Sequence, residues 1–210
     1  MPRTPARRPY KIFFTFIAAL LSAFLYSADK RDFPLSKNKT PVQVAPAEIF
    51  RIARVVDGDT LVLSNGEKVR LTGIDTPESH INPKAKKDSE RSGEDLQVIT
   101  KKGQEAARFV RELAEGKEVR LEYDVQQRDR YGRLLVYAYD IETLKNNPQV
   151  KLPEGLVISA NKEIFLNGSI IRSGYAAPMT VAPNVKYAPL FKQFYAEARG
   201  QKRGLWAQNP

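Results

Sequence analysis

Arg54-Val-Val-Asp57-Gly-Asp59-Thr60 and Arg70-Leu-Thr-Gly-Ile-Asp75-Thr76-Pro77-Glu78 are the two stretches around which the sequence is organised. Apolar, β-branched residues on both sides of Asp-Gly-Asp predict two strands, and Ser-Asn-Gly-Glu at residues 64–67 predicts a hairpin turn. If the strands pair through that turn, Asp59 lies near one end of the hairpin and Asp75 just past the returning strand. Two carboxylates brought together repel each other unless a cation sits between them, so the pattern indicates a metal site.

A purely structural interpretation of the same residues stays open at this point. Asp-Gly is also a common turn sequence, and Thr-Pro-Glu is an ordinary start of a helix or loop. The remainder of the chain has to decide between turns and chemistry.

Composition narrows the classes of site. The chain has 210 residues, 42% of them hydrophobic, which is enough for one compact domain with additional segments. Its formal charge of +10 favours a polyanionic partner without proving one. The absence of cysteine excludes disulfides, thiolate zinc sites and cysteine nucleophiles, and a single histidine, His80, disfavours zinc and histidine-based catalysis. Any metal must therefore be a hard cation held by oxygen.

The N-terminal region has the pattern of an export segment. A basic, proline-rich start precedes residues 12–28, which carry no charge and are rich in Phe, Leu, Ile and Ala. Residues 1–28 are therefore expected to be a signal peptide or an N-terminal membrane anchor, with the rest of the chain outside the cytoplasm. Residues 29–47, of mixed charge with three prolines, are expected to be a linker, and residues 48–210 the folded domain.

Hydrophobic periodicity within the folded domain predicts strands and helices. The expected strands lie near residues 50–56, 61–63, 69–74, 119–123 and 135–139. In the first of them, Phe50, Ile52, Arg54 and Val56 are expected to alternate with residues on the opposite face. The expected helices lie near residues 106–114, 164–171 and 187–198, with Gly-Leu-Trp at 204–206 packed behind the last. Residues 141–161 show no strong pattern. The fold class expected is α+β, a small barrel with helices packed on it.

Residues 79–102 are polar, with lysines and arginines among acidic residues. No period is sustained, so this segment is expected to be a mobile loop beside the site. Its charges are expected to be solvated rather than to form a specific contact surface.

A third motif, Asp129-Arg130-Tyr131-Gly132-Arg133, opens the last expected strand. Together with Val-Asp-Gly-Asp-Thr and Arg70…Asp75-Thr-Pro-Glu78, it resembles the staphylococcal (micrococcal) nuclease, or thermonuclease-like, family over roughly residues 49–207. The resemblance implies a five-stranded OB-fold barrel with three helices. It also implies calcium-dependent hydrolysis of DNA and RNA with low sequence specificity, leaving 5′-hydroxyl and 3′-phosphate ends.

The resemblance assigns the calcium ligands to Asp59, Asp75 and the backbone carbonyl of Thr76. Oxygen ligands of this kind suit Ca²⁺, and so small a set of protein ligands implies a water-rich site of modest affinity. Such a site suits a protein that works outside the cytosol.

The resemblance assigns catalysis to Arg70, Glu78 and Arg133, and contact with a second phosphate to Arg130 and Tyr131. Phosphodiester hydrolysis gathers negative charge on the phosphate oxygens, and arginine offers a planar, permanently charged fork that binds two of them at once. Glu78 is placed to orient or deprotonate the attacking water; the sequence leaves its status as a true general base open.

One departure from the family pattern concerns base contacts. Thr180 and Ala182 fall near the positions where the family carries a pair of tyrosines, which puts base stacking in doubt, and Tyr175 or Tyr187 is the available substitute. The competing function is a non-catalytic OB-fold module that binds nucleic acid or a protein partner. A membrane-anchored scaffold is a third interpretation that rests only on the N-terminus. We expect a monomer.

Overall fold

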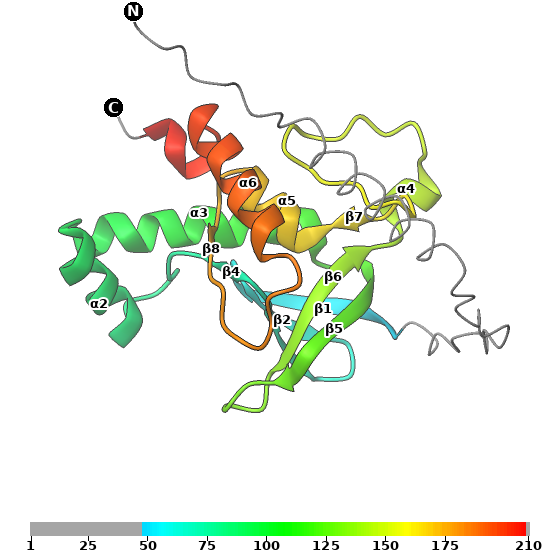
Figure 1. Cartoon of the computed structure of the whole chain (residues 1–210), viewed down its shortest axis with the longest axis horizontal. Coiled ribbons are helices and arrows are strands. Elements are labelled where there is room, and N and C mark those ends of the chain that lie inside the picture. Colours follow the sequence, from blue (N-terminus) through cyan, green and yellow to red (C-terminus); the bar gives the residue numbers. More distant parts are fainter. Residues whose placement is uncertain (1–47, 209–210) are drawn as a thin grey trace, which may run out of the picture. The chain divides into compact units, whose positions relative to one another are not determined.

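The computed structural model describes residues 48–208, so the predictions for residues 1–28 and 29–47 lie outside this part of the chain. Its elements, shown in Figure 1, are in chain order β1 (Ile49–Asp57), β2 (Thr60–Leu63), β3 (Lys68–Leu71), β4 (Ile74–Asp75), α2 (Pro83–Ser92), α3 (Leu96–Ala114), β5 (Glu118–Arg128), β6 (Leu134–Asp140), α4 (Thr143–Asn146), β7 (Ile164–Phe165), α5 (Leu166–Arg172), β8 (Ala177–Pro178), α6 (Ala188–Gly200) and the 3₁₀ helix η2 (Gly204–Gln208). Among these helices, none combines the length and the apolar character needed to cross a bilayer.

Five strands close into a barrel, which confirms the predicted fold class. Neighbouring strands pair in the order β3-β2-β1-β5-β6, and β3 also pairs with β6, so the two ends of the sheet are joined. The joining pair is parallel and sets Arg70 beside Leu135, whereas the other barrel pairs are antiparallel. Closure removes the open edges that a five-stranded sheet would otherwise expose.

The hairpin of β2 and β3 forms at the predicted turn. Leu63 N donates to the carbonyl oxygen of Glu67 over 2.9 Å. Gly66 adopts a φ of +86°, a conformation that glycine tolerates without steric penalty. The resulting register pairs Thr60 with Arg70, which places the arginine across from the residue that follows Asp59.

The strict alternation predicted for the first strand is wrong beyond Ile52. Ile52 and Val55 are both buried, whereas Arg54 and Val56 are exposed. The pairing of β1 with β2 shifts register between Ile52 and Arg54. A β-bulge adds one residue to a strand and reverses the faces that follow, so a pattern of period two cannot predict it.

The three predicted helices correspond to α3, α5 and α6, and all of them contribute to the core. Buried side chains of α3 include Ile99, Val110 and Leu113, and this helix contacts β1. Helices α5 and α6 contact each other, and Phe191 and Phe194 of α6 are buried. Full burial of one large apolar side chain contributes about 1.5–3 kcal/mol, so these faces fix the helices on the barrel.

Asn167 of α5 links the backbone of β6 to the turn after β3. It is fully buried, and its side-chain nitrogen donates to the carbonyl oxygens of Thr72 over 2.9 Å and Val136 over 3.2 Å. Its side-chain oxygen accepts from Ala138 N over 3.0 Å. One side chain therefore satisfies backbone groups of β6 and of the turn after β3, where unpaired polar groups would be costly.

The expectation of a loop over residues 79–102 is wrong. The segment contains α2 and the beginning of α3. Helix α2 starts at an N-cap, Asn82, whose side-chain oxygen accepts from Ala85 N over 2.8 Å, and Pro83 occupies the first helical turn. It ends at Gly93, in the left-handed conformation. Local capping, together with packing of the buried Ala85, overrides the absence of an extended apolar period.

Candidate active site

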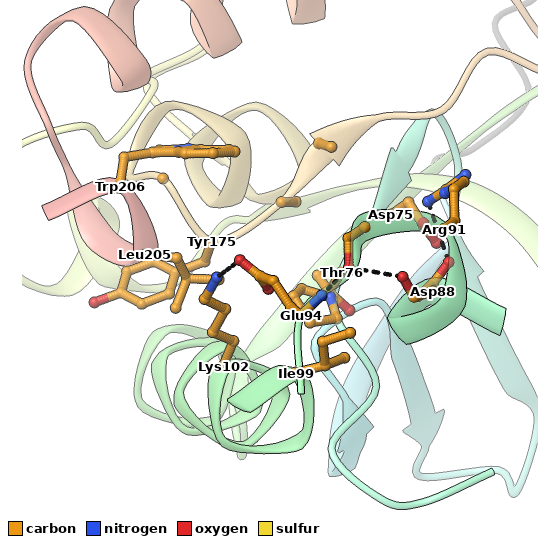
Figure 2. A pocket seen from close by; sticks show the side chains of 15 residues that line it. Asp75, Thr76, Asp88, Arg91, Glu94, Ile99, Lys102, Tyr175, Leu205 and Trp206 are labelled. Atoms are coloured by element: carbon orange, nitrogen blue, oxygen red, sulfur yellow. Dashed lines mark hydrogen bonds and ion pairs between the residues drawn. The ribbon is translucent and has the colours of Figure 1, made fainter. Parts of the chain in front are cut away.

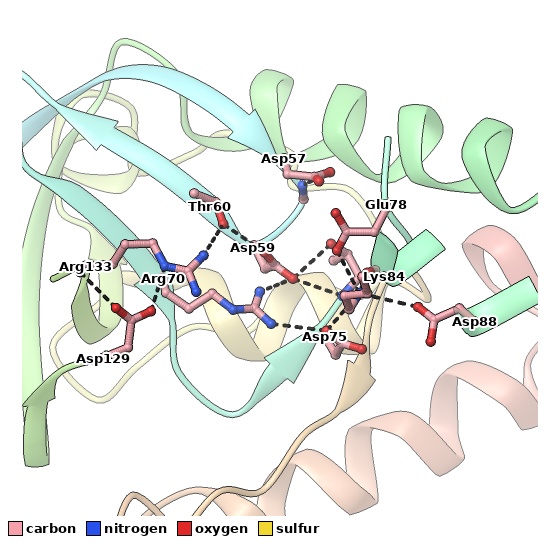
Figure 3. A network of polar contacts seen from close by, with 12 residues as sticks. Asp57, Asp59, Thr60, Arg70, Asp75, Glu78, Lys84, Asp88, Asp129 and Arg133 are labelled. Carbon is pink, nitrogen blue, oxygen red and sulfur yellow. Dashed lines mark hydrogen bonds and ion pairs between the residues drawn. The ribbon is translucent and has the colours of Figure 1, made fainter. Parts of the chain in front are cut away.

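The acidic and basic residues singled out from the sequence meet at one end of the barrel (Figure 3). Asp59 lies in the turn between β1 and β2, Arg70 in β3 and Asp75 at the end of β4. Arg70 lies between the two carboxylates: its Nη1 forms an ion pair with Asp59, and its Nη2 donates to Asp75 Oδ1 over 3.1 Å. The Arg70 guanidinium therefore contacts both carboxylates.

Arg70 is a largely buried charge, with only 8% of its surface exposed. Burial holds the pKa of its guanidinium below the usual value, although the neighbouring carboxylate of Asp75 acts in the opposite direction. A buried charge of this kind is retained only because it is paired. The pairing with two carboxylates fixes the orientation of the fork.

Asp59 is buried and accepts hydrogen bonds from two threonines. Its Oδ2 accepts from both the backbone N and the Oγ1 of Thr76, each over 3.1 Å. Its Oδ1 accepts from Thr60 Oγ1 over 3.0 Å. Gly58 permits this approach, since a Cβ there would lie 2.8 Å from the Thr76 side chain.

Arg133 reaches the same end of the barrel from the turn between β5 and β6. Its Nε donates to Asp129 Oδ2 over 2.7 Å, and its Nη1 donates to Thr60 Oγ1 over 3.4 Å. Thr60 in turn contacts Asp59, so a chain of polar contacts links the two predicted catalytic arginines. Because β3 and β6 are joined, residues separated by more than sixty positions in the sequence become neighbours.

Arg130 and Tyr131 lie on the exposed turn beside Arg133. The Arg130 guanidinium donates to Tyr131 Oη over 2.6 Å and lies 4.7 Å from the centre of the Tyr131 ring. Arg133 lies 5.7 Å from the same ring centre. Tyr131 is 69% exposed, which leaves its ring and the two arginines open to a ligand from solvent.

Glu78 follows β4 and is held by two neighbours. Asn82 donates to its Oε2 over 2.6 Å, and Lys84 lies 2.8 Å from its Oε1. Burial alone would raise the pKa of Glu78, but these hydrogen bonds outweigh it and hold the pKa below its usual value. Glu78 is therefore a carboxylate at neutral pH, the form that a base requires.

The donor atoms around Asp75 suit a hard cation. Asp75 Oδ1 and the carbonyl oxygen of Thr76 both face the ammonium of Lys84, at 3.3 Å and 3.2 Å. Within residues 48–208 no cluster of three or more His, Cys, Asp or Glu is arranged to hold a metal. A metal here would thus rely on Asp59, Asp75, the Thr76 carbonyl and water, a donor set that Ca²⁺ accepts.

Hollows flank the site on two sides. One, of about 530 Å³, is lined by Arg70, Asp129, Arg130, Tyr131 and Arg133 among others. The second, of about 250 Å³, includes Asp75 and Thr76 in its wall and extends over α2, α3 and the segment around Trp206 (Figure 2). Arg70 and Asp75, which contact each other, therefore belong to the walls of different hollows.

The substitutes considered for base stacking are differently placed. Tyr175 stacks on Phe109, with ring centres 4.3 Å apart. The Tyr187 hydroxyl lies 3.0 Å from that of Tyr139, and its ring packs against Tyr137 at 4.6 Å. Tyr187 is thus engaged in the core, Tyr175 lies in the wall of the smaller hollow, and Tyr131 is an exposed ring in the wall of the larger one.

Sequence reasoning missed Lys84 and Asn82. Both fell within the segment expected to be a solvated loop, yet they contact the oxygens of Glu78. The signal that could have found them is Asn82-Pro83, an N-cap residue followed by proline, which predicts a helix start four residues beyond Glu78.

Comparison with known proteins gives a consistent picture. The family model described as staphylococcal nuclease homologue matches residues 68–208. The chain is 28% identical over 166 residues to a thermonuclease of Staphylococcus hyicus, covering 78% of each protein, and 27% identical over 193 residues to a thermonuclease of Staphylococcus intermedius, covering 90% of this chain and 93% of that one. It is also 31% identical over 160 residues to an uncharacterized endonuclease of Escherichia coli, covering 75% and 76% of the two chains.

The matched region contains Arg70, Asp75, Thr76, Glu78 and Arg133, and the two staphylococcal relatives are named thermonucleases. The resemblance deduced from three short motifs is thereby confirmed. The chain belongs to the staphylococcal nuclease homologue family and is a hydrolase of the nuclease type.

Proposed function

We propose that this chain is a calcium-dependent nuclease that hydrolyses phosphodiester bonds of DNA and RNA with low sequence specificity. The products would carry 5′-hydroxyl and 3′-phosphate ends. The observation that carries the proposal is the meeting of two guanidinium groups, Arg70 and Arg133, with Asp59, Asp75 and Glu78 at one end of the barrel (Figure 3).

The arginines would bind the scissile phosphate. Arg70 is fixed by its two carboxylates and Arg133 by Asp129, so neither guanidinium has to be ordered when substrate arrives. Fixed donors aimed at the oxygens where charge develops stabilise the transition state. In enzymes that stabilise developing charge in this way, removing one such donor typically reduces turnover by about 10²–10³-fold.

Glu78 would act on the attacking water, accepting its proton or orienting it. Asn82 fixes one carboxylate oxygen, which leaves Oε1 as the atom available for water once Lys84 moves away. A calcium ion held by Asp59, Asp75 and the Thr76 carbonyl would supply positive charge and help to orient the phosphate.

The surface around the candidate site is consistent with a polymeric substrate. Arg130 and Tyr131 in the larger hollow offer a cation and an aromatic ring to the next phosphate or base. The smaller hollow has Asp75 and Thr76 in its wall. A strand that occupied both hollows would present an internal bond to the candidate site, as endonuclease cleavage requires.

A non-catalytic binding module is the competing function. It would use the same basic groups but would not need the complete set of acids and arginines. All five residues of that set are present, and they are brought together.

Replacing Asp75 with asparagine is expected to raise the calcium concentration needed for half-maximal cleavage by about tenfold, since the loss of one charged ligand weakens the site. The measurement is a calcium titration of single-stranded DNA cleavage. Glu90→Gln, which removes an equal charge from an exposed position of α2, serves as the control and should leave the requirement close to that of the wild type. An unchanged requirement in Asp75→Asn would show that Asp75 is not a ligand.

The remaining assignments stay predictions. Export, with cleavage or membrane retention of residues 1–28, a linker over residues 29–47 and a folded domain over residues 48–210 are proposed on the sequence pattern. The same holds for a monomeric state.

A further inference from the structure

The ammonium of Lys84 in α2 points toward the carboxylates of Asp75, Glu78 and Asp88, which form the acidic cluster (Figure 3). Besides Asp75 Oδ1 and the Thr76 carbonyl, its Nζ contacts Glu78 Oε1 at 2.8 Å and Asp88 Oδ2 at 3.5 Å. Four oxygen atoms thus surround one positive charge, and two of them belong to residues proposed to bind calcium. Hard cations favour this kind of all-oxygen environment.

The position of Lys84 at the start of α2 is unfavourable for a positive charge unless nearby acids compensate it. It is the second residue of α2, and the first turn of that helix contains no acid. A positive charge near a helix N-terminus is repelled by the helix dipole. The carboxylates of Asp75 and Glu78 offset that repulsion, so the helix start and the acidic cluster depend on each other.

Lys84 can also leave the cluster. Its side chain is 38% exposed, in contrast to the 9% of Arg70, so rotation about its flexible stem would carry the ammonium into solvent. A divalent ion at the same oxygens would repel the ammonium, and both cannot occupy one position.

We infer that Lys84 is an internal counter-cation that occupies the Asp75 and Thr76 side of the proposed metal position when calcium is absent and is displaced when calcium binds. The inference rests on the proposed calcium site. Lys84 thereby stabilises the metal-free cluster and weakens calcium binding. Its departure also frees Glu78 Oε1, so calcium binding and exposure of the proposed base are coupled.

Lys84→Met tests this with two readouts that do not depend on activity. Isothermal titration of the full-length chain with calcium is expected to show about tenfold tighter binding in the variant, because no competing cation has to be displaced. Thermal unfolding in excess chelator is expected to occur about 2–4 °C lower than in the wild type, because the acids lose their counter-charge. Saturating calcium should then raise the melting temperature more in the variant than in the wild type.

Lys87→Met is the matched control, since it removes an equal charge from an exposed position of the same helix. It should leave both the affinity and the chelated melting temperature close to the wild-type values. If Lys87→Met bound calcium as tightly as Lys84→Met, the gain in affinity would arise from long-range charge alone, and the inference would be overturned.

Asp75→Asn separates failure of the inference from failure of the calcium site. If Asp75→Asn weakens binding but Lys84→Met leaves it unchanged or weaker, the metal site stands and the role of Lys84 is wrong. If all three proteins bind calcium equally, both the ligand assignment and the inference are overturned.

Discussion

Arg70→Lys is expected to reduce kcat for DNA cleavage by about 10²–10³-fold, the loss typical of removing one fixed donor to a developing charge. Lysine keeps the positive charge but has no planar fork, so it cannot bridge Asp59 and Asp75 while facing a phosphate. The measurement is kcat and KM on single-stranded DNA at saturating calcium, together with a thermal unfolding curve to show that the variant is folded.

Arg111→Lys is the control for this substitution. Arg111 lies on α3, is exposed and pairs with Glu115 on the same helix. Exposed pairs contribute only about 0–1 kcal/mol, so this variant should retain wild-type turnover. A fully active Arg70→Lys protein would remove Arg70 from the mechanism.

Gly103→Ala is expected to destabilise the protein by about 1–3 kcal/mol, the typical effect of forcing extra volume into a packed region. A Cβ at Gly103 would lie 2.2 Å from the carbonyl oxygen of Glu78 and 2.6 Å from Ser79 N. Alanine is the better helix former by about 1 kcal/mol, so local propensity alone predicts the opposite sign. Helix α3 would have to move away from the segment that carries Glu78, and cleavage activity should fall as well.

Urea unfolding measures the change in stability, and Gly200→Ala provides the comparison. Gly200 ends α6, and a Cβ there would meet no atom within 4 Å. That variant should be as stable as the wild type or slightly more so. Wild-type stability and activity in Gly103→Ala would show that α3 does not support the Glu78 segment.

Local chemistry explains which parts of the fold could be predicted. Asn65-Gly66 predicted the hairpin because the turn requires a positive φ at Gly66, which few residue types other than glycine adopt readily. The joining of β3 to β6 could not be deduced in that way, since it is a parallel pairing between segments distant in sequence. The bulge in β1 was missed because it breaks the alternation on which the prediction relied.

The residues of the candidate site could be singled out from the sequence, but the contacts between them could not. The motifs identified Arg70, Asp75 and Glu78, and the structure brings them together. That Arg70 would itself bridge the acids, and that Lys84 would face them, depends on the barrel closure and on the start of α2. The run of charged residues at 79–102 does not reveal which lysine faces the site, because all of its lysines carry the same side chain.

The most direct test of the proposed nuclease activity is cleavage of single-stranded DNA by the full-length chain, compared in calcium and in excess chelator, with the product ends identified. We expect cleavage that requires calcium and leaves 5′-hydroxyl ends. Binding of the DNA without cleavage in either condition would contradict it and favour the non-catalytic module.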